Sequence, residues 1–138
     1  MNKQYFAVFD TNVLVSALMS ARQDSPTVRL LDYVIDDRIV LLYNGEILSE
    51  YDDVLHRDKF HFSEERIQAV LDLVKTGLCL DPTTTPEDFP DPDDRVFYEV
   101  ALSKDGSYMV TGNRKHFPKT SIVVAPAEML QIIQDEDV

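Results

Sequence analysis

Short apolar runs alternate with segments of helical spacing along this chain, and this alternation constrains the fold more than any other feature of the sequence. The apolar runs predict strands at residues 5–9, 39–43, 78–80, 108–111 and 122–124. Apolar residues at helical spacing fall within residues 13–19, 28–35, 47–55, 67–74, 96–101 and 129–133. Such an alternation predicts an α/β domain with a mostly parallel sheet that helices cover on both faces.

The length and composition predict a single domain, residues 1–138, that ends in an acidic tail at about 134–138. No apolar run approaches the roughly 18 residues that span a bilayer. The first residues lead straight into a predicted strand, so we expect a cytoplasmic protein without a membrane partner. The single cysteine, Cys79, cannot form an internal disulfide, and its apolar neighbours predict a buried thiol.

The formal net charge of −12 is unusual for a protein that would bind nucleic acid. Such proteins generally carry a basic face, because neutralisation of phosphates drives their binding. Two interpretations are open. Either the substrate is not a nucleic acid, or local basic residues and metal ions hold it. Composition alone favours the first.

Polar residues directly follow two of the predicted strands. Asp10, Thr11 and Asn12 follow the first strand, and Asn113 follows the strand at 108–111 after one glycine. In parallel α/β sheets, ligands bind beyond the carboxyl ends of the strands, where the strand order reverses. Asp10 taken alone is more typical of a helix N-cap than of a catalytic acid.

Further acids lie in two other segments. Glu50 lies at the margin of an apolar helix stripe, three residues after Ile47 and four before Val54, where a carboxylate needs a metal ion or a salt bridge. In Asp91-Pro92-Asp93-Asp94, the first acid fits a helix N-cap, and the helix dipole favours the other two. Three acids nevertheless exceed what capping needs.

Together these acids indicate metal-dependent hydrolysis. Mg²⁺ and Mn²⁺ prefer carboxylate oxygens, and carboxylates clustered without a cation repel one another. Such cations can activate water and stabilise the leaving oxygen in phosphodiester hydrolysis. His56, His61 and His116 lack the spacing of zinc ligands, and we expect surface positions or substrate contacts for them.

Four segments of the chain resemble the PIN-domain family, specifically its bacterial branch of toxin components of toxin–antitoxin systems. The segments occur in the family's order and spacing and span about residues 5–130. They are Phe9 to Leu18, Ile47 to Leu55, Asp91 to Asp94 and Val110 to Pro118. The first or the third alone would be weak evidence, whereas all four in register are specific.

The resemblance implies an α-β-α sandwich with a five-stranded, mostly parallel sheet, and an endoribonuclease activity that depends on Mg²⁺ or Mn²⁺. Asp10, Glu50 and Asp94 match the catalytic, metal-binding acids of the family. Asn113 lies where many PIN domains have a fourth acid, so it would bind metal without adding charge. Whether the site holds one metal ion or two stays open. The residues that match supporting positions are Thr11, Asn12, Asp91 and Thr111.

Basic residues follow Asn113 and offer a local contact for RNA phosphates. Arg114, Lys115 and His116, with Lys119 beyond them, would supply the attraction that the global charge lacks. The alternative is a solvated loop. Besides RNA, the expected partners are a cognate antitoxin and further copies of the chain.

Two other functions compete with that of a ribonuclease. A phosphatase of the haloacid-dehalogenase type has a second Asp two residues after the first, where this chain has Asn12, and a receiver-like phosphoacceptor needs an acid pair that Asp10 lacks. A PIN fold that binds RNA or a protein without cutting is the stronger rival. The acidic surface and Asn113 favour it, whereas the three acids count against it.

Overall fold

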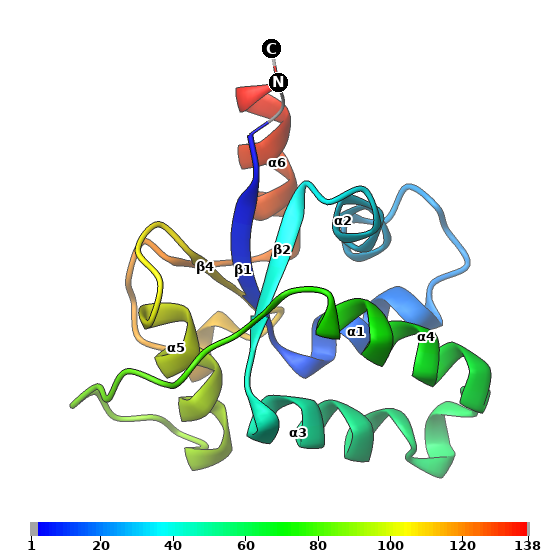
Figure 1. Ribbon diagram of the computed structural model, residues 1–138, viewed down its shortest axis with the longest axis horizontal. Coiled ribbons are helices and arrows are strands. Elements are labelled where there is room, and N and C mark those ends of the chain that lie inside the picture. The colour runs from blue at the N-terminus through cyan, green and yellow to red at the C-terminus, as the bar shows by residue number, and fades with distance from the viewer. Residues whose placement is uncertain (1–2, 138) are drawn as a thin grey trace.

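A five-stranded sheet forms the centre of the computed structural model, which describes residues 3–137 (Figure 1). Its strands are β1 (Tyr5–Phe9), β2 (Ile39–Tyr43), β3 (Leu78–Cys79), β4 (Tyr108–Val110) and β5 (Val123–Val124). The order across the sheet is β3-β2-β1-β4-β5, and every neighbouring pair is parallel. The predicted five-stranded sheet is therefore confirmed, with all strands parallel and β1 in the middle.

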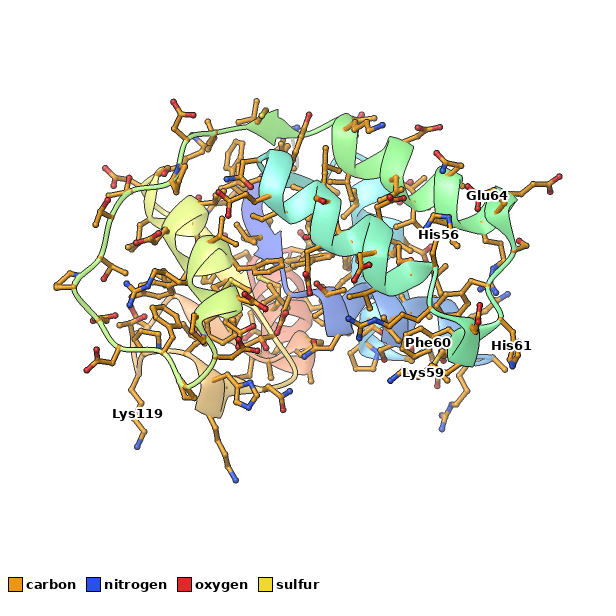
Figure 2. All side chains as sticks on the ribbon, turned by 90° about the horizontal axis from the view of Figure 1, so that it is seen from below. His56, Lys59, Phe60, His61, Glu64 and Lys119 are labelled. Atoms are coloured by element: carbon orange, nitrogen blue, oxygen red, sulfur yellow. The ribbon has the colours of Figure 1, made fainter. Side chains whose placement is uncertain are left out.

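Helices cover both faces of this sheet. The α-helices are α1 (Thr11–Met19), α2 (Pro26–Ile35), α3 (Gly45–Leu55), α4 (Glu64–Lys75), α5 (Arg95–Leu102) and α6 (Pro126–Glu136). Short 3-10 helices are Asp58–Phe60, Pro92–Asp94 and Arg114–His116. On one face α2 packs against α1 and α6, while on the other α4 packs against β2, and α5 against β1, β2 and β4 (Figures 1 and 2). The predicted α-β-α sandwich is confirmed.

Polar side chains determine where several helices begin. Ser25, Asn44 and Ser63 each accept a hydrogen bond from a backbone amide in the first turn of α2, α3 and α4. Each such cap satisfies an amide that has no partner within the helix. No helix among the described residues is both long and apolar enough to cross a membrane.

Cys79 is exposed, whereas its apolar neighbours predicted a buried thiol. The reason is the position of β3, which is two residues long and lies at the edge of the sheet, where only β2 pairs with it. The apolar character of a short run does not distinguish an edge strand from a central one.

The acidic end of the chain is only partly a free tail. Asp135 and Glu136 still belong to α6, and Asp137 accepts a hydrogen bond from Arg38 at 2.6 Å. Val138 lies outside the described residues. These contacts hold the end of α6 beside the start of β2.

Gly77 allows the chain after α4 to pass close to β2, and it provides a test of this packing. A Cβ atom at Gly77 would lie 1.9 Å from the backbone oxygen of Leu41, which belongs to a buried strand and cannot move aside. We therefore expect Gly77→Ala to lower the free energy of unfolding by about 1–3 kcal/mol, as measured by urea denaturation.

Gly45→Ala is the matched control for that experiment. Nothing lies within 4 Å of a Cβ at Gly45, and alanine is a better helix former than glycine. This variant should be as stable as the wild type or more stable. Equal stability of Gly77→Ala and the wild type would contradict the close approach of the two backbones.

Candidate active site

The carboxylate of Asp10 lies at the carboxyl end of the central strand and is buried, with 8 % of the residue exposed. Its Oδ1 accepts a hydrogen bond from the Thr11 amide at 2.8 Å, so Asp10 is the N-cap of α1. Its Oδ2 accepts hydrogen bonds from the Thr111 hydroxyl at 2.7 Å and from the Asn12 side-chain amide at 3.2 Å. Capping therefore uses only one of the two carboxylate oxygens.

The polar residues around Asp10 connect the loops that follow β1 and β4. Asn12 accepts a hydrogen bond from the Gly112 amide at 3.2 Å, and the Thr111 hydroxyl accepts one from the Asn113 amide at 2.9 Å. Thr111 itself is fully buried. This network fixes the orientation of the Asp10 carboxylate at the place where the strand order predicts a ligand site.

Asp94 is the second acid of this region. It ends the short helix Pro92–Asp94, whose first turn is capped by Asp91 through the Asp93 amide at 3.0 Å. Burial and the charges of Asp10 and Asp91 raise the pKa of Asp94 to about 6. The charge of His116 opposes the rise in the pKa of both Asp94 and Asp10, so one imidazole acts on both carboxyl groups.

Glu50 lies in a neighbouring hollow of about 300 Å³, which Asp93 also lines. Burial and then the charge of Asp93 raise the pKa of the half-buried Glu50. Arg57 pairs with Asp53 at 3.5 Å, and among residues 3–137 Glu50 has no ion pair. The salt bridge that was one explanation for this carboxylate is thus not found in the described part of the chain.

In the structure the predicted acids form two neighbouring pairs rather than one cluster. Asp10 interacts with Asp94, and Glu50 interacts with Asp93 in the adjoining hollow. Within residues 3–137 there is no group of three or more His, Cys, Asp or Glu side chains arranged to hold one metal ion. The metal-binding roles of these acids and of Asn113 therefore stay predictions.

The chemistry of the donors nevertheless fits a hard divalent cation. The pKa values of Asp10, Glu50 and Asp94 are all raised, mainly by burial, and a bound cation would stabilise the charged form of each. The buried Thr11 hydroxyl beside Asp10 also lacks a hydrogen-bond partner among the described residues. A cation with a shell of waters would satisfy such groups.

Of the three histidines, only His116 adjoins this region. Its Nδ1 lies 3.4 Å from Asp94 Oδ2. His56 instead contacts Glu64 at 2.7 Å and connects α3 to α4, and Figure 2 shows His56 and His61 at the end of the molecule opposite Lys119. All three histidines are exposed, so the prediction of surface positions is confirmed for each of them.

Arg114 and Lys115 are exposed at the start of the loop that follows β4. Arg114 forms an ion pair with Glu128, whose carboxylate also accepts a hydrogen bond from the Ala125 amide at 2.9 Å. The loop is therefore attached to the start of α6 and is not free along its whole length.

Tyr51 is a supporting residue that the sequence reasoning did not identify. Its hydroxyl donates a hydrogen bond to the carbonyl of Phe9 at 2.5 Å, inside the core and directly before Asp10. The charge of Asp10 adds to burial in raising the pKa of Tyr51. A tyrosine on the buried stripe of a helix, next to a candidate acid, was the available signal, because a buried hydroxyl needs a partner.

Comparison with known proteins gives one match. The PIN domain family model matches residues 7–115, which include part of β1, all of β2, β3 and β4, and the three predicted acids. No curated protein and no solved structure matches the chain.

The raised pKa of Asp94 predicts how stability depends on pH in metal-free buffer. The folded state binds a proton with a pKa of about 6, against an ordinary value of 3.8, so the free energy of unfolding falls as pH rises between these values. Asp94→Asn removes this loss. The free energy of unfolding of the variant minus that of the wild type should therefore be greater at pH 7 than at pH 4, by on the order of 1–3 kcal/mol in urea unfolding experiments. The same stability difference at both pH values would contradict the repulsion between Asp94 and its neighbours.

Proposed function

The chain belongs to the PIN-domain family, and we propose that it is a metal-dependent endoribonuclease that hydrolyses RNA phosphodiester bonds with Asp10, Glu50 and Asp94. PIN domains are generally nucleases and typically use divalent metals. The observation that carries the proposal is the buried Asp10 carboxylate, which three hydrogen bonds hold at the carboxyl end of β1. The charge of Asp10 also helps to raise the pKa of Asp94 at the start of α5. A buried carboxylate and a partly buried one that repel each other are suited to share a cation.

In the proposed reaction, Asp10, Glu50 and Asp94 would hold Mg²⁺ or Mn²⁺, with Asn113 as a neutral oxygen ligand. The bound metal would supply an activated water and compensate the charge on the scissile phosphate. Asp10 is held in place for this by its hydrogen bonds to Asn12 and Thr111. No protein nucleophile is needed.

The remaining residues of the site act on the substrate or on the acids. His116, beside Asp94, would orient that carboxylate and contact the RNA. Arg114 and Lys115 would bind phosphates of the RNA backbone, which fixes its position without selecting its sequence. Thr11 and Asp91 support the site by shaping the starts of the two helices that present the acids.

We also propose that the enzyme acts in the cytoplasm as the toxin component of a toxin–antitoxin pair, with an antitoxin protein and further copies of the chain as partners. The support is the segment Val110 to Pro118, which resembles that bacterial branch of the family.

Cleavage of a labelled RNA tests the proposed activity directly. The wild type should cut it with Mn²⁺ or Mg²⁺ and stop when EDTA is added. Asp94→Asn should lower the rate by about 100-fold or more while the protein stays folded, because a ligand that compensates charge in the transition state is lost. Asp72→Asn, which makes the same change on the exposed side of α4, should leave the rate unchanged.

A non-catalytic RNA-binding PIN fold is the second candidate function. The arrangement of the described acids favours it, because no three of them form one metal-binding group. A wild type that binds RNA but never cuts it with either metal, and an Asp94→Asn variant that binds equally well, would make this candidate the better account.

Asn113→Asp tests the proposed fourth ligand. The substitution restores the acid that many PIN domains have at this position and adds a negative charge suited to a second Mg²⁺. The metal concentration that gives half-maximal cleavage should fall, and the rate at saturating metal should not. An unchanged metal requirement would show that Asn113 is not a ligand.

A further inference from the structure

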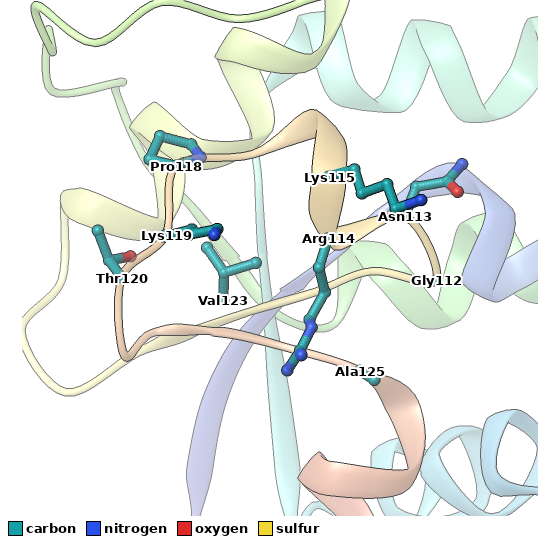
Figure 3. A pocket seen from close by; sticks show the side chains of 9 residues that line it. All are labelled: Gly112, Asn113, Arg114, Lys115, Pro118, Lys119, Thr120, Val123 and Ala125. Carbon is teal, nitrogen blue, oxygen red and sulfur yellow. The ribbon is translucent and has the colours of Figure 1, made fainter.

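A hollow of about 680 Å³ lies beside the candidate active site, between the loop after β4 and the start of α6 (Figure 3). It is lined by Gly112, Asn113, Arg114, Lys115, Pro118, Lys119, Thr120, Val123 and Ala125. Gly112 and Asn113 also line a second hollow with Asn12, the partner of Asp10. The larger hollow therefore adjoins the network that holds the Asp10 carboxylate.

The charge of this hollow differs from that of the rest of the chain. The protein has 25 acidic and 13 basic residues, yet residues 106–127 contain no Asp or Glu. Arg114, Lys115 and Lys119 line the hollow. Arg114 pairs with Glu128 and, in Figure 3, extends along one side of the hollow toward Ala125. Neither lysine has an ion pair with any residue in the part of the chain that the structure describes, so both are available for an anion.

The hollow also has an apolar part, formed by Pro118, Val123 and Ala125. Its volume of about 680 Å³ falls within the range of roughly 300–1,000 Å³ in which small ligands bind. A ligand suited to such a site combines an anionic group with a flat apolar group. A nucleotide has both, because its phosphate binds cations and its base packs against apolar or aromatic surface.

We propose that this hollow is a subsite for one nucleotide of the RNA strand, next to the phosphate that is cut. Lys115 and Lys119 bind the phosphates on either side of this nucleotide, and its base packs against Pro118 and Val123. The inference rests on the proposed function, because it requires an RNA strand that runs from the catalytic acids into the hollow. It explains how a chain with a net charge of −12 holds RNA, since the contact is made where acids are absent.

Binding without metal separates this subsite from catalysis. The affinity of a labelled five-nucleotide RNA is measured by fluorescence anisotropy in EDTA, where metal-dependent cleavage does not occur. Lys119→Ala should weaken binding about tenfold and reduce the slope of log Kd against log salt by about 1. Lys75→Ala removes the same charge from an exposed site on α4 and should change Kd less than about twofold.

Ala125→Phe tests the hollow itself without changing charge. The larger side chain would occupy the space of the base and should weaken binding about tenfold, by the loss of base packing. Circular dichroism confirms that each variant is folded. Inorganic polyphosphate of five phosphates serves as a competitor that has charge but no base, and it should displace the RNA only at much higher concentration.

Three results would overturn the subsite. They are wild-type affinity in both Lys119→Ala and Ala125→Phe, equal loss in Lys119→Ala and Lys75→Ala, and displacement by polyphosphate at the same concentration as unlabelled RNA. The first would mean that RNA binds outside the hollow, and the other two that it is held by general charge attraction. The expected differences in binding could be found while neither the wild type nor any variant cuts RNA with Mn²⁺. In that case the nuclease proposal fails and the subsite stands.

Discussion

The buried carboxylate of Asp10 connects the end of the central strand, the start of α1 and the loop after β4. Burial of a charge is costly unless hydrogen bonds or a counter-ion compensate it, and here Thr11, Asn12 and Thr111 all donate to the carboxylate. Because these donors follow β1 and β4, on the two sides of the strand-order reversal, the hydrogen bonds that satisfy one acid also hold these two loops together. The arrangement leaves Asp10 with a raised pKa, so hydrogen bonding compensates its burial only in part.

The same region concentrates negative charge where the fold offers little positive charge to balance it. Asp94 has a pKa of about 6, because Asp10 and Asp91 add to the effect of burial, and His116 only partly opposes them. Basic side chains are instead grouped in the adjoining loop after β4. Under the proposed function the roles are divided: the acids would hold a cation that acts on the scissile phosphate, while the lysines would hold the RNA strand beside it.

Much of this could be predicted from the sequence, because strands and helix caps depend on local chemistry. The run Tyr5–Phe9, the cap at Asp10 and the cap at Asp91 all lie where their residue types place them. The exposure of Cys79 could not be predicted, because it depends on the place of its strand at the sheet edge. The separation of Glu50 from Asp10 and the existence of the nucleotide-sized hollow depend on how α3, the segment at 91–94 and α6 pack in three dimensions. Sequence spacing carries no information on those distances.

The central claim is that Asp10 at the carboxyl end of β1, Glu50 in the middle of α3 and Asp94 at the start of α5 hold a divalent cation. Crystals soaked in Mn²⁺ test it most directly, because anomalous scattering locates the ion without reference to activity. The account predicts a strong anomalous peak within coordination distance of carboxylate oxygens of Asp10 and Asp94, and no such peak in crystals of Asp10→Asn. The absence of a peak there in the wild type, under conditions in which the protein cuts RNA, would contradict it.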